Sequence, residues 1–387
     1  MNKIKVGIIG MGYIGVSHIE ALNRISGVDI CAVADANYEL AKQRAEQFGI
    51  SRCFASMDEL IADPEIQAIH NCTPNFLHTQ VNERAILAGK HIFSEKPLAR
   101  SSRENEPVLE ALKAHPEVVA GVNFCYRMYP LIQDAKNRIA AGEIGRPYLV
   151  HGSYLQDWLL HDTDYNWRIE REYTGDSRCV ADIGSHWIDL AQVLMGCRIV
   201  EVCAAMDTVM PVRKKPARQV ESFAKNDPNA EYTEIKVDTE DCACMLLRFA
   251  DGTTGTMLCS QVSAGRKCYI DIEVDGSDAS FHWNHEMGDR MWKGNRDSSN
   301  EEILRNPNLM TPQAAQYSHL GAGHAEGWND AFKNNIQAFY DFIRSGKQLG
   351  KDKPDFATFE EGHYILKLTD AILKSGREKR WVRIDEV

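Results

Sequence analysis

Lys96 stands at a position where a lysine side chain can do chemistry. It follows the apolar pair Ile92-Phe93, near the point where a buried strand would end, and Pro97 comes directly after it. A lysine that is partly desolvated beside another positive charge has a lowered pKa, so it can share a proton with an oxygen atom or polarise it. An ordinary surface turn would also accommodate these residues, and the rest of the chain must decide between the two interpretations.

Asp182 and His186 are the second set of candidates, within the segment DIGSHWIDL. Residues four apart share one face of a helix, so both side chains could point into one cleft. An imidazole can take a hydroxyl proton near neutral pH, and a carboxylate can orient hydroxyl groups. For an isolated pair, a helix-start aspartate and a histidine packed at a domain boundary are the favoured explanation. No H-E-x-x-H or H-x-H pattern supports a zinc site, so we expect no metal.

A glycine-rich turn precedes both sets. Gly10, Gly12 and Gly15 match G-x-G-x-x-G between an apolar strand and a plausible helix, the context that a dinucleotide fingerprint requires. Asp35 ends the next predicted strand, where an acidic residue would bind the adenosine ribose hydroxyls and repel a 2′-phosphate. Asp35 could instead only cap the helix predicted over Tyr38–Phe48. No arginine follows Asp35 closely, so NAD is favoured over NADP.

Alternating strands and helices surround these residues in the first third of the chain. Such repeating units predict a doubly wound parallel sheet, whose ligands lie outside the carboxyl ends of the strands. The residues at those ends are Thr73, Pro74, Asn75, Glu95, Lys96 and Asn123. The predicted strands are Val28–Ala34, Ala68–Cys72, His91–Phe93 and Val118–Asn123, and the predicted helices are Tyr38–Phe48, Ser56–Ala62, Thr79–Ala88 and Ser102–Ala114. Lys96 therefore falls on the cofactor side of the sheet.

Strands dominate after residue 124, following one helix predicted over Leu131–Ala141. Turns at Asp251-Gly252 and Asp275-Gly276 favour an open, mainly antiparallel sheet with a helix inserted near residues 184–195. The predicted strands are Tyr148–Leu155, Ile199–Val209, Cys242–Phe249, Thr253–Ser260, Tyr269–Val274 and Ala279–Trp283. Polar stretches at Lys225–Asp238 and Gly288–Pro312 are predicted to be surface loops, and the basic residues Arg213-Lys214-Lys215 with Arg218 a solvated loop.

The composition excludes several classes of function. A formal net charge of −11 over 387 residues argues against nucleic-acid binding, which needs a basic surface. No stretch is long and apolar enough to span a bilayer, so we expect no membrane partner. Eleven cysteines without a C-x-x-C pair suggest reduced thiols and a cytoplasmic location.

Three motifs in order, GIIGMGYIG, EKP and DIGSHWIDL, resemble those of the Gfo/Idh/MocA family of NAD(P)-dependent sugar and polyol dehydrogenases. The segments YLQDW, WR and GHAEG look closest to the branch that contains the levoglucosan and glycoside 3-dehydrogenases. The resemblance implies a Rossmann domain over residues 1–124 and an α/β domain over 125–387 for substrate binding and oligomerisation, as a homodimer or homotetramer. It also implies a cis peptide between Lys96 and Pro97.

The resemblance carries roles onto particular residues of this chain. Lys96, Asp182 and His186 fall on the catalytic positions, with His186 and Lys96 in acid–base roles. The implied cofactor residues are Gly10, Gly12, Tyr13, Ile14, Gly15, Asp35, Thr73, Pro74, Asn75, His78, Glu95, Lys96, Asn123, Trp167 and Arg168. The implied substrate residues are Lys96, Tyr126, Arg127, Gln156, Trp158, Asp182, His186 and His324.

An NAD-dependent oxidoreductase acting on a secondary alcohol of a sugar, inositol or glycoside is therefore the leading hypothesis. One alternative is a glycoside hydrolase or lyase that retains NAD and acts by transient oxidation. Another is a non-catalytic sugar or NAD sensor, which would not need the intact set Lys96, Asp182 and His186.

Overall fold

The computed structural model describes residues 3–217 and 231–387, and these residues form two compact units. The first unit contains the chain up to Met128 together with Trp328–Tyr364, and the second contains Tyr129–Gly327 together with Ile365–Val387. In none of the described helices is a stretch both long and apolar enough to cross a membrane.

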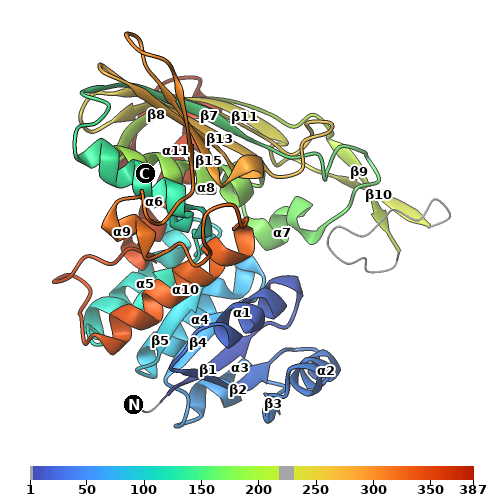
Figure 1. Ribbon diagram of the computed structural model, residues 1–387. Helices are drawn as coiled ribbons and strands as arrows, with labels where there is room; N and C mark the ends of the chain where they lie inside the picture. Colours follow the sequence, from blue (N-terminus) through green and yellow to red (C-terminus); the bar gives the residue numbers. More distant parts are fainter. Residues whose placement is uncertain (1–2, 218–230) are drawn as a thin grey trace. The chain divides into compact units, whose positions relative to one another are not determined.

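A seven-stranded sheet organises the first unit (Figure 1). Its six N-terminal strands pair in parallel, as in a doubly wound sheet, and a short edge strand from the C-terminal part pairs antiparallel with the last of them. Across the sheet the strands are β17 (Ala357–Thr358), β6 (Ala120–Val122), β5 (His91–Ser94), β4 (Ala68–Asn71), β1 (Ile4–Ile9), β2 (Val28–Ala34) and β3 (Arg52–Phe54). The predicted Rossmann architecture is confirmed.

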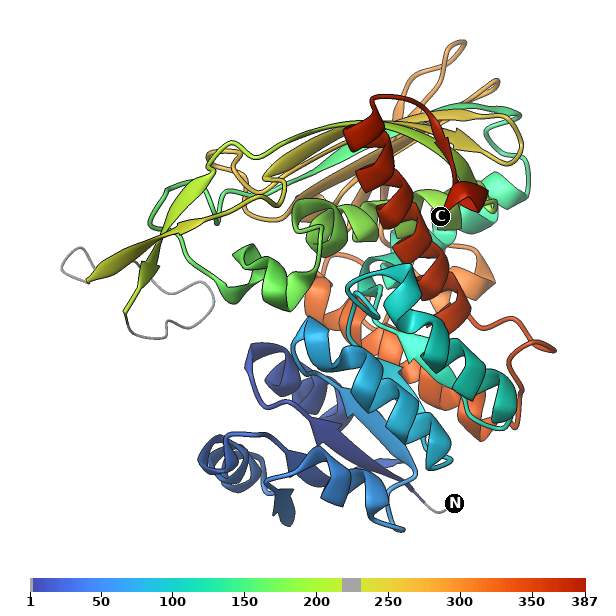
Figure 2. The ribbon, with the colours of Figure 1, turned by 180° about the vertical axis from the view of Figure 1, so that it is seen from behind.

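Helices cover both faces of this sheet, and two pairs of them pack side by side. Helix α1 contacts α10, and α4 contacts α5, as the views in Figures 1 and 2 also show. The helices of the unit are α1 (Tyr13–Asn23), α2 (Tyr38–Phe48), α3 (Met57–Ala62), α4 (Asn75–Leu87), α5 (Ser102–Ala114), α10 (Trp328–Arg344) and the first part of α11 (Phe359–Glu378), with the 3-10 turn η1 (Cys125–Met128).

Helix α4 begins four residues before the predicted start at Thr79. Pro74 occupies the N-cap position with φ −63°, and the chain is helical from Asn75. Proline is compatible with a helix start because its fixed φ is suited to that position and the first N–H groups of a helix have no intrahelical partner. Residues 75–78, which lie between the predicted strand and the predicted helix, therefore form the first turn of α4.

A nine-stranded, mainly antiparallel sheet organises the second unit, as predicted. Only β7 and β12 run parallel to each other within it. Its strands in spatial order are β16 (Glu301–Leu304), β15 (Arg290–Gly294), β14 (Ser280–Asn284), β13 (Tyr269–Gly276), β7 (Pro147–Leu155), β12 (Thr254–Ser260), β11 (Cys242–Phe249), β8 (Ile199–Asp207) and β18 (Val382–Arg383).

Helix α8 (Ser185–Met195) covers one face of this sheet, where it contacts β7 and β13 (Figure 1). The indole N–H of Trp187 donates to the carbonyl oxygen of Asp271 at 2.8 Å. A Cβ on Gly152 would lie 2.1 Å from that same oxygen and 2.8 Å from the indole nitrogen, so only glycine permits the approach. The unit also contains α6 (Pro130–Ala140), α7 (Arg171–Thr174), α9 (Pro312–Ala315), the 3-10 turns η2 (Trp167–Ile169), η4 (His285–Met287) and η5 (Ile384–Glu386), and the π-turn η3 (Val180–Gly184).

Two segments predicted to be loops contain strands. Residues 288–312 include β15 and β16, which extend the edge of the large sheet. In the predicted loop 225–238, residues 225–230 lie outside the described residues. The remainder includes β10 (Tyr232–Lys236), which pairs with β9 (Val212–Pro216) in a separate two-stranded ribbon. The prediction failed because short strands with charged side chains at a sheet edge lack the apolar alternation that identifies a half-buried strand.

The prediction of a solvated loop for the basic cluster was wrong in its structure and for Arg213, whereas the side chains of Lys214 and Lys215 are partly exposed. Arg213, Lys214 and Lys215 lie on β9, and the side chain of Arg213 is fully buried against Asp241, whereas Arg218 lies outside the described residues. A run of basic residues cannot by itself reveal that one of them has a distant acidic partner.

Residues 328–364 were assigned by the sequence to the second domain, but they pack in the first unit. On α10, Phe339 packs against Phe93 of β5, with ring centroids 5.1 Å apart. The hydroxyl group of Tyr340 lies 2.8 Å from Nε2 of His70 on β4. The first unit is therefore completed by a segment that follows most of the large sheet in the chain.

Candidate functional site

The glycine turn between β1 and α1 has the geometry that a pyrophosphate needs. Gly10 has φ +98°, and a Cβ there would lie 2.5 Å from the carbonyl oxygen of Cys72. A Cβ on Gly15 would lie 2.1 Å from the carbonyl oxygen of Gly10, so this glycine permits the close approach of helix and turn. A Cβ on Gly12 would meet no atom within 4 Å, and no side chain caps the start of α1. These features fit a phosphate group at the helix N-terminus.

Tyr13 and Ile14, the other predicted cofactor residues of this turn, form the first turn of α1. Tyr13 is exposed and Ile14 is half-buried.

Asp35 lies at the carboxyl end of β2 and faces the glycine turn. Its Oδ2 accepts a hydrogen bond from the backbone N–H of Met11 at 2.7 Å, and its Oδ1 accepts one from the N–H of Asn37 at 2.8 Å. Helix α2 is capped by Asn37, whose side chain accepts from the N–H of Leu40. The capping role that could have explained Asp35 therefore belongs to Asn37, and the position of Asp35 fits the ribose hydroxyls.

His78 connects two of the predicted cofactor segments. Its Nε2 lies 2.7 Å from the carbonyl oxygen of Thr73, and its Nδ1 lies 2.6 Å from that of Pro97. The side chain is buried, so His78 connects the two turns inside the protein and not at its surface. A neutral imidazole has one N–H, and only a protonated ring can donate to both oxygens. Burial has the largest effect and holds the pKa of His78 below its usual value, although the two carbonyl oxygens act in the opposite direction. The ring is therefore neutral and donates to one of the two oxygens.

The Glu95 carboxylate faces the interior of the first unit. Its Oε1 accepts from Nδ2 of Asn123 at 2.6 Å and lies 2.9 Å from Nε2 of His18. Burial alone would raise the pKa of Glu95, but the contacts with His18 and Asn123 and the nearby charge of Lys96 hold that pKa below its usual value. Glu95 is thus a buried anion directly before Lys96. The Lys96–Pro97 peptide is cis, as predicted.

A chain of buried polar side chains leads away from Glu95. Nδ1 of His18 lies 2.7 Å from Nδ1 of His70, whose Nε2 lies 2.8 Å from the hydroxyl group of Tyr340. Burial, and then the charge of His18, lower the pKa of His70 well below its usual value, so His70 is neutral. Asn123 joins the same network, since its Oδ1 accepts from Nδ2 of Asn335 at 2.9 Å. Helix α10 therefore supports the turn that carries Lys96.

In the second unit, Asp182 lies in the π-turn η3 and His186 in the first turn of α8. Such local widening of a helix is frequent at functional sites. Nε2 of Gln261 donates to Oδ2 of Asp182 at 3.0 Å, and Nε of Arg168 lies 3.6 Å from Oδ1. His186 is only 7% exposed, with its ring centroid 6.3 Å from that of Tyr154.

Trp167 and Arg168, which were assigned to the cofactor, lie together beside Asp182. The guanidinium carbon of Arg168 is 4.5 Å from the centroid of the Trp167 ring, a cation–π distance. Arg168 therefore stacks on the indole ring of Trp167 and lies beside the carboxylate of Asp182, within the second unit.

The other predicted substrate residues have mixed surroundings. Arg127 is buried in η1 and forms an ion pair with Glu361 at 3.2 Å, and Tyr126 beside it is also buried. Nε2 of Gln156 donates to the hydroxyl group of Tyr154 at 3.2 Å. Trp158 packs against the cluster of Leu159, Ile169 and Val237, and His324 lies exposed.

The predicted candidates thus form two groups, one in each unit. The first unit brings together the glycine turn, Asp35 and the turns at Thr73 and Lys96. The second brings together Asp182, His186 and Arg168. Sequence reasoning missed Gln261, His18, His70 and Tyr340, because each acts through a contact with a residue far away in the chain and belongs to no motif considered there.

One group of described residues has atoms placed to hold a metal ion: His151, Glu273 and Asp275, whose potential ligand atoms lie within 4.8 Å of one another. None of these three residues belongs to the predicted sites.

Comparisons with known proteins agree with this geometry. Residues 4–124 match the model of an oxidoreductase family with an NAD-binding Rossmann fold, and residues 132–282 match the GFO/IDH/MocA C-terminal domain. The chain is 30% identical to levoglucosan dehydrogenase of Pseudarthrobacter phenanthrenivorans over the full length of both. It is 24% identical to myo-inositol 2-dehydrogenase of Thermotoga maritima over 99% of each chain.

Solved structures give the same result. A levoglucosan dehydrogenase in complex with NADH and L-sorbose is similar with a TM-score of 0.87 and 28% identity over 99% of each chain. Full-length identity at this level, with both domain models matched in order, leaves the family in no doubt. The chain belongs to the Gfo/Idh/MocA family of NAD-binding oxidoreductases.

Proposed function

We propose that this protein is an NAD-dependent dehydrogenase that acts on a secondary alcohol of a sugar, inositol or glycoside. The observation that carries the proposal is the presence in one chain of an NAD-binding glycine turn and of Asp182 and His186, a carboxylate and an imidazole held in adjacent turns. Relatives named as levoglucosan and inositol dehydrogenases support the substrate class.

The reaction requires a base for the hydroxyl proton and an acceptor for the hydride. Bound NAD would supply the hydride acceptor. His186 takes the hydroxyl proton, a role that suits an imidazole near neutral pH. Lys96 polarises the reacting oxygen or shares its proton, and Asp182 accepts hydrogen bonds from the substrate and orients it.

The cofactor is held by groups of the first unit. The N-terminus of α1, reached through Gly10, Gly12 and Gly15, receives the pyrophosphate. Asp35 receives the adenosine ribose and disfavours a 2′-phosphate, so NAD is the preferred cofactor. The turns at Thr73 and Lys96, tied together by His78, lie at the carboxyl ends of β4 and β5.

The test is direct. We expect NADH absorbance to appear when the purified protein is mixed with NAD and a panel of inositols, aldoses and glycosides, and to appear more slowly with NADP. Absence of turnover with every compound would contradict the proposal. NADH that stays bound through gel filtration, without net turnover, would instead indicate an enzyme that retains its cofactor.

Two substitutions test the roles of single residues. Lys96→Met and His186→Ala should each abolish turnover while the Kd for NAD changes little, because neither role concerns the adenosine or pyrophosphate groups. Matched controls are Lys113→Met and His115→Ala, whose side chains pair with Glu110 and Glu117 on the surface. Full turnover in either test variant would contradict the assigned role.

We also propose that the protein is a homo-oligomer, a dimer or tetramer, that uses the outer face of the large sheet. The alternation along β11 and β12 directs Ala243, Met245 and Met257 inward, toward the covered face. The opposite face presents exposed apolar side chains at Leu246, Leu258, Trp292 and Leu304. Apolar side chains gathered on one exposed sheet face are typical of a subunit interface.

Light scattering coupled to size-exclusion chromatography tests the oligomer. We expect a mass that is a multiple of 43.6 kDa, and a shift toward the monomer when Leu246→Lys is combined with Leu258→Glu. Leu87→Lys, at an exposed position on α4, is the control. A monomeric wild type would contradict the proposal.

All eleven cysteines are free thiols, which supports the prediction of a cytoplasmic location.

A further inference from the structure

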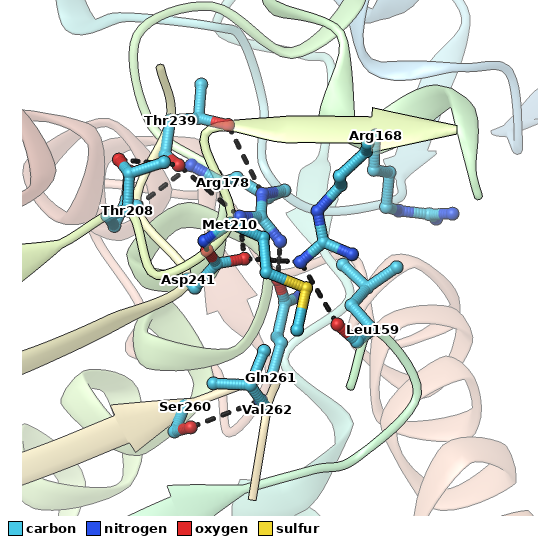
Figure 3. Close-up of polar contacts among 12 residues, drawn as sticks. Leu159, Arg168, Arg178, Thr208, Met210, Thr239, Asp241, Ser260, Gln261 and Val262 are labelled. Carbon is cyan, nitrogen blue, oxygen red and sulfur yellow. Dashed lines mark hydrogen bonds and ion pairs between the residues drawn. The ribbon is translucent and has the colours of Figure 1, made fainter. Parts of the chain in front are cut away.

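A cluster of buried charges in the second unit includes Arg178 and Asp241, which Figure 3 shows. It is linked to Asp182 through Gln261. Arg178 and Arg213 both contact Oδ1 of Asp241, Arg213 through Nη2 at 2.7 Å, and all three side chains are fully buried. Oδ2 of Asp241 accepts a hydrogen bond from the backbone N–H of Met210 at 2.9 Å. Burial alone would raise the pKa of Asp241, but the two guanidinium groups hold it below its usual value.

Buried ion pairs of this kind contribute little to stability, because removing the charges from water offsets much of their attraction. The cluster therefore calls for an explanation beyond folding. Arg213 contacts backbone carbonyl oxygens, among them that of Leu159 at 3.0 Å. Arg178 instead contacts the amide group of Gln261, which is fully buried and directly follows β12.

Arg178 determines which way that amide points. Nη1 of Arg178 donates to Oε1 of Gln261 at 3.1 Å, and a guanidinium group has donors only, so the amide oxygen must face it. The amide nitrogen then faces Asp182 and donates to its Oδ2 at 3.0 Å. With the opposite orientation, two donors would face each other at Arg178 and two acceptors at Asp182.

Hydrogen bonds also fix the backbone of Gln261. Its N–H donates to the carbonyl oxygen of Asp241 at 3.0 Å, and its carbonyl oxygen accepts from the N–H of Leu159 at 3.2 Å. Arg178 is held in turn, since its Nε donates to the hydroxyl oxygen of Thr239 at 3.2 Å. Figure 3 shows Arg178, Thr239, Asp241 and Gln261 converging on one another.

The loop Thr239–Asp241 also holds the segment that carries Asp182. Oε1 of Glu240 accepts from the hydroxyl group of Ser177 at 2.7 Å and from the N–H groups of Arg178 and Val180 at 2.9 and 3.0 Å. Thr239, Glu240 and Asp241 therefore fix the start of the π-turn η3 and the direction of the amide that meets it.

We propose that Gln261 is a positioning residue for Asp182, and that the buried Arg178–Asp241–Arg213 cluster sets the direction of its amide. The amide donates to one oxygen of the carboxylate, while Arg168 faces the other oxygen. The neutral amide of Gln261 fixes the orientation of the Asp182 carboxylate without adding a further charge beside it. This inference rests on the proposed function for its effect on turnover, but the contact itself can be tested without turnover.

Gln261→Glu is the decisive variant because it keeps size and shape. The new carboxylate would still accept from Arg178, but an ionised oxygen would face Asp182 where a donor stood. Once protonated, the introduced carboxyl group could donate as the amide does, so activity should return as the pH falls and the two carboxyl groups share a proton. The other charged groups around the pair are Arg178, Arg168, Asp241, Arg213 and Glu240, and His186 follows Asp182 by one helical turn.

We expect kcat of Gln261→Glu to be about 10- to 100-fold below that of the wild type at pH 8, with the deficit shrinking toward pH 5. Gln261→Met, which has no donor, should lose a similar factor at every pH. The Kd for NAD should not change in either variant. Gln192→Glu is the control, because its side-chain oxygen accepts from the N–H of Ile199, a contact that the new carboxylate keeps.

A merely structural role would lower thermal stability and kcat without any rescue at low pH. Unchanged kcat in Gln261→Glu across the pH range, in an otherwise active enzyme, would overturn the inference and leave the proposed function intact. If the wild type turns over no substrate, the proposed function fails by itself. The contact is then judged from carboxyl ¹³C titration of Asp182, identified by its loss in Asp182→Asn. A pKa raised in Gln261→Met supports the inference, and an unchanged pKa overturns it.

Discussion

His78 acts as a tie between two backbone turns. Its two ring nitrogens lie 2.7 and 2.6 Å from the carbonyl oxygens of Thr73 and Pro97, which belong to turns at the ends of neighbouring strands. Lys96 stands directly before Pro97, so the imidazole acts on the lysine through the backbone. The family resemblance implies a cofactor-binding role for this histidine, whereas its contacts show that it supports the turns at Thr73 and Pro97.

His78→Asn should therefore reduce turnover more than it reduces folding. The imidazole places one ring nitrogen at each carbonyl oxygen, whereas the shorter asparagine side chain can reach only one of them, so the turn at Lys96 gains freedom. We expect kcat to fall about 10- to 100-fold, as for other residues that position a reacting group. Steady-state kinetics and thermal melts at one pH give the comparison. His115→Asn, at the surface, is the matched control, and unchanged kcat in His78→Asn would show that the tie is dispensable.

Strand β13 shows how the alternation of one element separates two environments. Ile270, Ile272 and Val274 point into the core, while Asp271, Glu273 and Asp275 point to the opposite face. His151 lies opposite Glu273 on β7, and the three acidic groups crowd one side of the sheet. Burial, and then the charge of Asp275, raise the pKa of Glu273, while His151 and His282 act in the opposite direction.

Glu273→Gln should stabilise the protein at neutral pH. A carboxyl group whose pKa is raised on folding binds its proton more tightly when folded, so its contribution is present below the unfolded pKa and is lost as the pH rises through the folded pKa. Glutamine removes that loss. We expect a higher Tm than the wild type at pH 7.5 and little difference at pH 4.

Thermal melts of Glu302→Gln provide the control, because that exposed residue forms a surface pair with Arg290, and such pairs contribute little to stability. A Tm for Glu273→Gln that is lower than the wild type at pH 7.5 would mean that the carboxylate is stabilised by its histidine neighbours.

At the scale of the whole molecule, the first unit is built from two distant parts of the chain. Helix α10 and strand β17 follow most of the large sheet in sequence but complete the Rossmann unit. Phe339 is fully buried against Phe93 and Phe356, and Tyr340 ends the polar chain that leads to Glu95. The cofactor-binding unit therefore depends on residues far beyond its last parallel strand, β6.

Phe339→Ala should destabilise the first unit by about 3–5 kcal/mol, because a large buried ring is lost and a cavity remains. Urea unfolding followed by tryptophan fluorescence and by NAD binding measures the loss, and the NAD-binding signal should disappear at lower urea than in the wild type. Leu87→Ala, at an exposed position of α4, should change the midpoint little. Equal midpoints for Phe339→Ala and the wild type would show that α10 does not support the cofactor unit.

The sequence by itself determined the motif residues and many, but not all, of the helices and strands of this protein. The glycine fingerprint, the lysine at a strand end and the alternating strands each depend on local spacing, and local spacing predicted both sheets. The cis Lys96–Pro97 peptide followed from the resemblance of the EKP motif to that of known relatives. The sequence did not predict the strands β15 and β16, because their charged side chains interrupt the alternation of apolar and polar residues.

Only the tertiary structure decided which distant residues hold those motifs in place. Arg213 pairs with Asp241, and Gln261 donates to Asp182. Tyr340 contacts His70, 270 residues away in the chain. A buried charge or amide is identified by its partner, and a partner that is distant in sequence leaves no local pattern. The class of reaction could therefore be predicted from short motifs, but the contacts that position the motif side chains exist only in the folded chain.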